Sequence, residues 1–256
     1  MRPIVTLLSD WRTRDPYVAM FKGALLTAAP EVEIIDITHV VDLYNLQQAA
    51  FLTQQSYRSF PEGSVHLLLA GTSHAAKAKA APICVQYDNH FFIGEDNGIF
   101  FMMFNRDFPV VARQYAGNET NMTDQLVQLV KAVCDNKLES QTIAYDNFKR
   151  QFAALPIHFP STKTIEGEIV YIDAYYNAIT NIPIDMFKEA VHDGPFQAII
   201  SSKKDWQCQV YHDNYQPDEE IYLTQNALGC LEITLYQGAV SVLADLKVGD
   251  KITIKY

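Results

Sequence analysis

The spacing of apolar and polar residues changes once along this chain. Before residue 137, apolar runs of strand length alternate with stretches whose apolar residues recur at helical spacing. Strands are predicted at 3–8, 32–37 and 65–69, and helices at 16–29 and 45–57. This strand–helix order predicts a three-layer α/β/α domain with a mostly parallel sheet.

Local signals set the bounds of several elements. Asp15 is expected to cap the first helix, with Pro16 at its first position and Pro30 after its end. Asn45 is expected to cap the second helix. Asp88 and Asn89 are typical of the turn of a β-hairpin, here between 82–87 and 90–93. A third amphipathic helix is predicted at 123–134.

After residue 164 the pattern consists of short runs rich in β-branched and aromatic residues. The predicted strands lie at 167–172, 196–201, 206–211, 221–224, 231–235 and 251–256. Regular short strands of this kind favour a smaller antiparallel β-barrel or sandwich. The stretch 137–164 follows neither rhythm and is interpreted as a connecting segment. We therefore predict two domains, 1–154 and 155–256.

Composition excludes several classes of protein. The 256 residues are 48% hydrophobic, which is too apolar for a disordered chain. Twenty basic against 30 acidic side chains give a net charge of −10, and this balance argues against nucleic acid as a partner. The longest apolar run, Ile99–Phe104, is far shorter than the roughly 20 residues of a membrane span. We expect a cytoplasmic protein without a membrane partner.

The four cysteines give no sign of a metal or redox site. Cys84, Cys134, Cys208 and Cys230 form no C-x-x-C pair. They are expected to be buried, reduced thiols. No metal site is predicted.

Three polar clusters follow predicted strands, where open α/β sheets place their ligands. The first begins with Ser9-Asp10, and a carboxylate there could accept hydrogen bonds from a ribose diol or could simply cap a turn. The second ends in His39, either a general base or a hydrogen-bonded structural residue. The third, Asp173 to Asn181, offers donors and acceptors to a polar ligand, although such residues also form ordinary turns.

Taken in order, these clusters resemble the S-adenosylmethionine hydroxide adenosyltransferases, the adenosine-forming hydrolases related to the fluorinases and chlorinases. The similarity extends over most of the chain. The matching segments are Ser9-Asp10, Asp15-Pro16-Tyr17-Val18, Lys22-Gly23, Ile34-Ile35-Asp36-Ile37-Thr38-His39, Ala49-Ala50-Phe51, Phe60-Pro61-Glu62-Gly63-Ser64-Val65-His66, Asp96-Asn97-Gly98 and Asp173-x-Tyr175-x-Asn177-x-x-Thr180-Asn181.

The resemblance implies that water or a halide attacks the ribose 5′ carbon of S-adenosylmethionine and displaces methionine. The protein would orient the sulfonium and hold the nucleophile in line. No cofactor is implied, since S-adenosylmethionine is itself the substrate or ligand. Family members are trimers whose sites lie between the first domain of one subunit and the second domain of the next, so a homotrimer is expected.

The resemblance also implies roles for individual residues. Asp10 would hold the ribose hydroxyls, and Asp173 and Asn177 would meet the methionine end. Tyr175 would occupy the aromatic position near the ligand. The remaining two positions, whose backbone would flank the adenine, are Leu235 and Gln237.

The chain departs from the water-using branch at its catalytic residues. That branch has an Asp-Pro-Gly-Val-Gly loop after the third strand, an Arg seven residues after the Asp, and a later His. Gly71 stands at the Asp position and Ala78 at the Arg position, and Asn121 takes the His position if Asp124 closes that segment. The catalytic set of the hydrolases is therefore missing.

Other residues could replace this set. His74 could position a water and Lys79 could supply positive charge, although the loop also reads as an ordinary solvated one. A halide would need hydroxyl donors, which Thr72, Ser73 and Thr123 could contribute. The leading prediction is a divergent S-adenosylmethionine hydrolase. The alternative is a nucleoside- or S-adenosylmethionine-binding protein that kept the fold and lost the chemistry.

Overall fold

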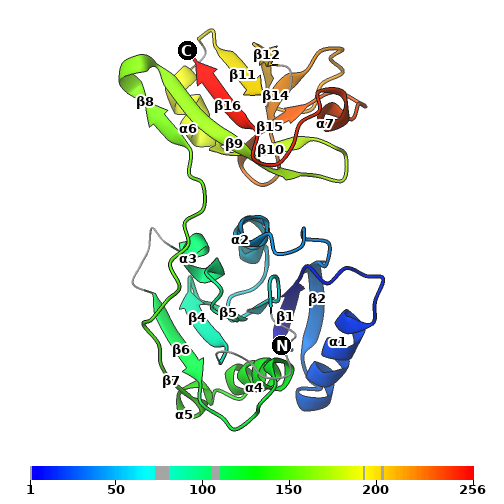
Figure 1. Cartoon of the computed structure of the whole chain (residues 1–256), viewed down its shortest axis with the longest axis vertical. Helices are drawn as coiled ribbons and strands as arrows, with labels where there is room; N and C mark the ends of the chain where they lie inside the picture. Colours follow the sequence, from blue (N-terminus) through cyan, green and yellow to red (C-terminus); the bar gives the residue numbers. More distant parts are fainter. Residues whose placement is uncertain (1, 73–80, 105–109, 193, 203–204) are drawn as a thin grey trace. The chain divides into compact units, whose positions relative to one another are not determined.

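The computed structural model describes residues 2–72, 81–104, 110–192, 194–202 and 205–256 (Figure 1). The chain divides into two compact units, Met1–Ala153 and Ala154–Tyr256. This division falls one residue before the boundary expected from the sequence. Each unit has its own core and is described by itself.

The first unit is built on a sheet whose described strands run in the order β2-β1-β3-β5-β4-β6-β7. Neighbours from β2 to β5 pair in parallel, whereas β4, β6 and β7 join antiparallel, which confirms the mostly parallel sheet. The strands are β1 (Ile4–Leu8), β2 (Glu33–Thr38), β3 (Val65–Leu68), β4 (Ile83–Tyr87), β5 (His90–Gly94), β6 (Val111–Tyr115) and β7 (Thr142–Ala144).

Helices cover both faces of this sheet. On one face α1 (Tyr17–Ala28) packs with α4 (Met122–Cys134), and on the other α2 (Leu46–Ser56) packs with α3 (Ile99–Phe104). Successive strand residues point to opposite faces. Leu7 accordingly belongs to the core under α1 and α4, while Leu8 belongs to the core under α2 and α3. These are the three predicted layers. Two short elements complete the unit: η1 (Tyr57–Ser59) and α5 (Leu138–Gln141).

Some local expectations for this unit are wrong. Helix α1 begins at Tyr17 with Pro16 at the N-cap position and no side-chain cap, so Asp15 is not the cap. The stretch 137–164 is not all linker, because α5, β7 and β8 (Ile157–Phe159) lie within it. Asn45 does cap α2, since its Oδ1 accepts the Gln48 N–H at 3.0 Å.

The second unit contains a curled sheet that forms a half-barrel, as Figure 1 shows. Its described strands run in the order β12-β11-β16-β9-β10-β15-β14-β13, with β8 also paired to β9. All these pairs are antiparallel except β13 with β14. The strands are β9 (Thr164–Ile172), β10 (Ala178–Pro183), β11 (Gln197–Ser201), β12 (Trp206–Cys208), β13 (Tyr211–His212), β14 (Tyr222–Gln225), β15 (Cys230–Thr234) and β16 (Lys251–Lys255).

Three short helices accompany this sheet: η2 (Pro160–Thr162), α6 (Ile184–Val191) and α7 (Val240–Leu243). The predicted strand at 206–211 is interrupted and forms β12 and β13. Strand β10 (Ala178–Pro183) is a central strand of this sheet, and it contains residues 178–181, interpreted from the sequence as part of a polar cluster.

Three further observations concern membrane spans, metal sites and the cysteines. No described helix has the length and apolar character needed to cross a membrane. Within the described ranges, no group of three or more His, Cys, Asp or Glu side chains could hold a metal ion. The four cysteines are free thiols, and of them Cys134 is partly exposed rather than buried.

Candidate functional site

Asp10 lies at the carboxyl end of β1, where the loops after three neighbouring strands meet. Its side chain is 4% exposed, and its Oδ2 accepts the Tyr44 N–H at 2.9 Å and the Gly71 N–H at 3.1 Å. These two donors come from the loops that follow β2 and β3, the strands on either side of β1. Asp10 therefore joins three loops at the carboxyl edge of the sheet, where open α/β folds bind their ligands, and is more than a local turn residue.

A chain of side-chain contacts fixes the turn that carries Asp10. Ser9 Oγ lies 2.7 Å from His39 Nδ1 and accepts the Trp11 N–H at 3.3 Å. On its other side, His39 Nε2 lies 3.1 Å from Asp36 Oδ1, and Lys22 Nζ lies 2.6 Å from Asp36 Oδ2. The residues before and after Asp10 are thus tied to β2 and α1.

This chain of contacts shows what His39 does. Burial raises the pKa of Asp36, but hydrogen bonds from Lys22 and His39 outweigh it and bring that pKa below its ordinary value. An ionised Asp36 beside Nε2 favours the tautomer that carries its hydrogen on Nε2, which leaves Nδ1 to accept a hydrogen bond from the Ser9 hydroxyl. Since His39 is 6% exposed, with Ser9 beside Nδ1 and the Asp36 carboxylate 3.1 Å from Nε2, the geometry fits the structural interpretation rather than the general base.

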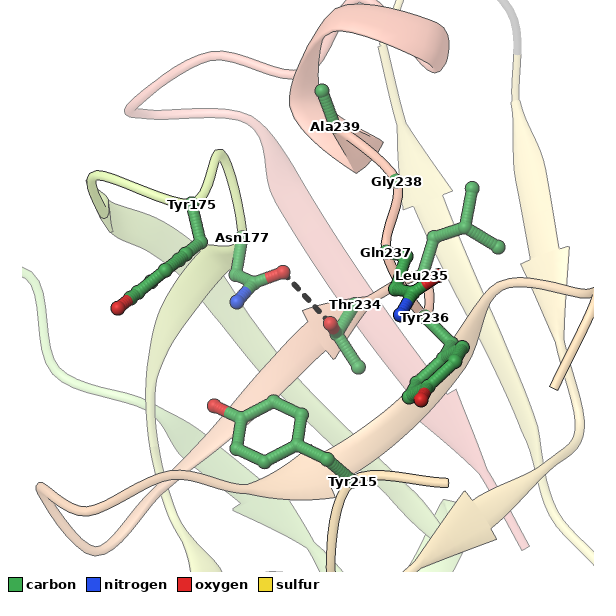
Figure 2. A pocket seen from close by; sticks show the side chains of 9 residues that line it. All are labelled: Tyr175, Asn177, Tyr215, Thr234, Leu235, Tyr236, Gln237, Gly238 and Ala239. Carbon is green, nitrogen blue, oxygen red and sulfur yellow. Dashed lines mark hydrogen bonds between the residues drawn. The ribbon is translucent and has the colours of Figure 1, made fainter. Parts of the chain in front are cut away.

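The second unit contains a pocket of about 690 Å³, shown in Figure 2. Three tyrosine rings are arranged around a hydrogen bond in which Thr234 Oγ1 donates to Asn177 Oδ1 at 2.7 Å. The pocket therefore combines aromatic surface with a small polar centre, as small-molecule sites usually do. Its lining residues are Tyr175, Asn177, Tyr215, Thr234, Leu235, Tyr236, Gln237, Gly238 and Ala239.

Four of the predicted ligand-binding residues share this pocket, although they come from segments about 60 positions apart. Tyr175 and Asn177 lie in the loop between β9 and β10. The other two, Leu235 and Gln237, follow β15. The two segments meet because β10 pairs with β15, with Ala178 opposite Ile233.

Asp173 has a different place from these four. It is not among the residues that line the pocket. Its Oδ1 accepts the backbone N–H groups of Tyr175 at 2.9 Å and of Asn177 at 2.8 Å. These bonds help the loop to place Tyr176 at a φ of 64°. The carboxylate therefore shapes the loop that presents Tyr175 and Asn177.

Sequence reasoning missed the other side chains of the pocket, chiefly Tyr215, Thr234 and Tyr236. Tyr236 lies between two predicted residues and could have been included on that ground. Tyr215 belongs to the segment between β13 and β14, which contains no motif. Its place in the pocket depends on the tertiary fold.

The positions that lack the hydrolase residues have structural roles here. Gly71 has a φ of 64° and gives its N–H to Asp10. Asn121 is the N-cap of α4, and its Oδ1 accepts the Asp124 N–H at 2.8 Å. Thr72 is buried, and its Oγ1 has no hydrogen-bond partner among the described residues. The other candidates from this loop, namely Ser73, His74, Ala78 and Lys79, lie outside the described residues.

Comparison with known protein families decides where the chain belongs. The N-terminal domain of the SAM hydroxide adenosyltransferases matches residues 5–132, and their C-terminal domain matches residues 167–253. The chain belongs to the SAM hydroxide adenosyltransferase family. The resemblance found in the sequence is confirmed, and both domains of the family occur in their order.

Individual relatives carry the names of two activities. An (R)-S-adenosyl-L-methionine hydrolase of Methanocaldococcus jannaschii is 22% identical over 99% of this chain and 96% of its own length. The corresponding hydrolase of Thermus thermophilus is 33% identical, but this match covers 43% of the chain and 41% of that protein. A fluorinase of Nocardia brasiliensis is 35% identical over 31% of the chain and 26% of its own length.

Solved structures share the fold. An uncharacterized conserved protein from Thermotoga maritima, with 22% sequence identity, superposes with a TM-score of 0.84 over 99% of this chain. A conserved hypothetical protein from Thermus thermophilus gives a TM-score of 0.72 at 21% identity. At this identity the likeness supports the architecture described above.

Proposed function

We propose that this protein binds S-adenosylmethionine and, as a divergent member of its family, hydrolyses it slowly to adenosine and methionine. The observation that carries the proposal is the pocket of the second unit. Residues assigned to the ligand from sequence resemblance, Tyr175, Asn177, Leu235 and Gln237, line one cavity there. An aromatic pocket with polar groups at its centre suits S-adenosylmethionine, since the rings can stack on the base and the Asn177 amide can bond to the methionine end.

The first unit would contribute the ribose contact. Asp10 is held by two backbone N–H groups on Oδ2, and its carboxylate stands at the edge of the sheet where ligands of α/β folds bind. A carboxylate can accept bonds from two neighbouring hydroxyls at once. We infer that the ribose diol binds at Asp10.

In this proposal the complete site forms in a homotrimer, with Asp10 of one subunit and the pocket of a neighbour around one ligand. Exposed apolar side chains lie in the loops near Asp10, including Leu43 and Tyr44, which are 63% and 77% exposed. Others lie at the pocket of the second unit, including Tyr175 at 79% and Tyr236 at 43%. Apolar surface of this kind is typical of a subunit interface.

The proposed reaction is a displacement at C5′ of the ribose. The oxygen of water forms a bond to C5′, the C5′–sulfur bond breaks, methionine leaves with the electron pair, and one proton is released. The protein would supply orientation and a dry environment. Because Gly71 has no side chain and the Asn121 side chain caps α4, the groups that activate water in the hydrolases are not supplied from these positions.

The test is incubation of the purified protein with S-adenosylmethionine, with adenosine and methionine measured by chromatography. We expect binding in calorimetry and slow formation of adenosine. Formation that stops in both His74→Ala and Lys79→Ala would support these two residues as replacements for the missing set. Absence of binding to both S-adenosylmethionine and adenosine would contradict the proposal.

A second candidate function is ligand binding without turnover. It is favoured by the same structural use of Gly71 and Asn121. The two candidates separate cleanly, because a binding protein would show a dissociation constant and no adenosine after prolonged incubation. A halide as the nucleophile is supported by the buried Thr72 hydroxyl and is tested by a search for a 5′-halo-nucleoside in halide buffers.

A further inference from the structure

A buried carboxyl group lies behind one wall of the pocket. Glu232, in the middle of β15, is 1% exposed. Neighbouring residues Leu231 and Ile233 point into the apolar core of the second unit. Since strand residues alternate, Glu232 points to the other face, the face on which Thr234 lines the pocket.

The segment between β13 and β14 covers this face. Tyr215 donates its hydroxyl to Glu232 Oε1 at 2.9 Å. The next residue, Gln216, is fixed by Tyr222, whose hydroxyl accepts the Gln216 N–H at 3.0 Å and donates to the Gln216 carbonyl at 3.1 Å. The Tyr215 ring forms part of the pocket wall, as Figure 2 shows.

Tyr215 would be poorly fixed without this bond. The residue is 53% exposed, so packing alone does not hold its ring. A surface side chain gains order when its polar end is bonded, and an ordered wall lowers the entropy cost of binding. The hydrogen bond to Glu232 is therefore the contact that can fix the position of the Tyr215 ring.

We propose that Glu232 is a positioning residue of this pocket, which holds the Tyr215 ring in the wall and makes nucleoside affinity depend on the charge of its carboxyl group. The inference rests on the proposed function, since it takes a nucleoside as the ligand. An ionised carboxylate is the stronger acceptor, because charge-assisted hydrogen bonds are about twice as strong as neutral ones. Affinity should therefore rise when Glu232 ionises.

The groups around Glu232 bring the ionisation of its carboxyl group into the pH range of a binding experiment. Its pKa is raised to about 7, chiefly by burial and also by the negative charge of Asp173, while the hydrogen bond from Tyr215 acts in the opposite direction. The Asn226 side chain lowers it. Across the sheet its neighbours are Thr224 and Ile179, which do not titrate. Tyr215, Asp173 and Tyr222 are the titratable groups of this cluster.

The test measures adenosine binding by calorimetry at pH 5.5 and pH 8. Adenosine stays neutral over this range, so its own charge does not contribute. We expect the wild type to bind about fivefold more tightly at pH 8, which corresponds to about 1 kcal/mol between a neutral and a charge-assisted bond. Glu232→Gln keeps the shape and cannot ionise, and Tyr215→Phe keeps the ring and loses the bond. Both variants should lose this pH-dependent gain.

The matched control is Glu219→Gln, which removes an exposed carboxylate from the same segment and should keep the wild-type pH profile. A wild-type profile equal to that of Glu232→Gln would overturn the inference, and so would a profile that survives in Tyr215→Phe. If the wild type binds neither adenosine nor S-adenosylmethionine, the proposed function fails instead.

A measurement without ligand distinguishes failure of this inference from failure of the proposed function. The carboxyl carbon of Glu232, assigned in NMR spectra by its absence from Glu232→Gln, should titrate near neutral pH. Its midpoint should rise in Tyr215→Phe, because that variant loses a bond that favours the charged form. An unchanged midpoint would show that the two side chains are not coupled.

Discussion

At the scale of single residues, a few polar side chains are buried at positions where an ordinary core has apolar ones. Asp10, Glu232 and His66 are each less than 5% exposed, and each has its own partners. Burial of a polar group without a bond costs free energy, so these partners are needed for the fold as well as for any ligand.

Asp10→Asn should weaken adenosine binding by more than tenfold. Loss of charge-assisted bonds to two ribose hydroxyls should cost about 2 to 4 kcal/mol, at about 1.4 kcal/mol per decade in the dissociation constant. Calorimetry measures the effect. Asp42→Asn, an exposed carboxylate in a neighbouring loop, should bind as the wild type does. Equal affinity of Asp10→Asn and the wild type would limit Asp10 to tying the loops.

The first unit should lose stability in mild acid through His66. Burial, and then the nearby His90, lower the pKa of His66 to about 3, against about 6.5 in an unfolded chain. The ring is fully buried between Thr6 Oγ1 at 2.8 Å and His90 Nδ1 at 3.1 Å, so the folded state disfavours its charged form. Its contribution is present above pH 6.5 and falls as the pH drops toward 3.

Between pH 7 and pH 5 this one group should cost the folded state about 2 kcal/mol. Urea unfolding at the two pH values measures the loss, and His66→Gln should show a smaller pH slope whatever its absolute stability. His158→Gln, at an exposed histidine, should keep the full slope. A slope equal in His66→Gln and the wild type would contradict the assignment.

At the scale of secondary-structure elements, most bounds follow from local signals and a few do not. Strands β1 to β3 and helices α1, α2 and α4 lie within one residue of their predicted bounds. Ile99–Phe104 forms α3, although an uninterrupted apolar run does not distinguish a buried helix from a strand. The buried side chains of this segment pack against α2, and this packing favours the helix over a strand.

Asn121→Ala should destabilise the first unit by about 1 kcal/mol, because it removes the cap of α4. Asn121→His, which would restore a hydrolase-like residue, should cost a similar amount, since histidine is a poor cap. Urea unfolding measures both. Asn118→Ala, at an asparagine outside any helix, is the control. If Asn121→His has the stability of the wild type, the fold tolerates histidine at this position.

At the scale of the whole molecule, each unit supplies one half of the proposed site. Asp10 belongs to the unit that ends at Ala153, and the pocket with Asn177 belongs to the unit that begins at Ala154. In the proposed trimer a ligand is bound by two subunits. This arrangement predicts behaviour that no single chain could show.

Subunits that each lack one half of the site should complement one another. Asp10→Asn and Asn177→Ala should each bind adenosine weakly as pure proteins. Mixed trimers, formed by refolding the two variants together, should regain a fraction of sites with nearly wild-type affinity. These sites take Asp10 from an Asn177→Ala subunit and the pocket from an Asp10→Asn subunit, so the site itself contains neither change. Light scattering should give a trimer. A monomer at micromolar concentration, or no recovery in the mixture, would contradict a shared site.

The sequence by itself determined the two-unit plan and the family, because strand–helix alternation, turn residues and ordered motifs are local in the chain. It also assigned Tyr175, Asn177, Leu235 and Gln237 to a ligand, since the family resemblance marks them individually. It could not assign Asp173 to loop shaping, which became evident from its two bonds to backbone N–H groups. Partners such as Glu232 with Tyr215, and His66 with His90, were decided by the tertiary structure. These pairs lie 17 and 24 positions apart and meet because strands and covering segments bring them together, which no local pattern records.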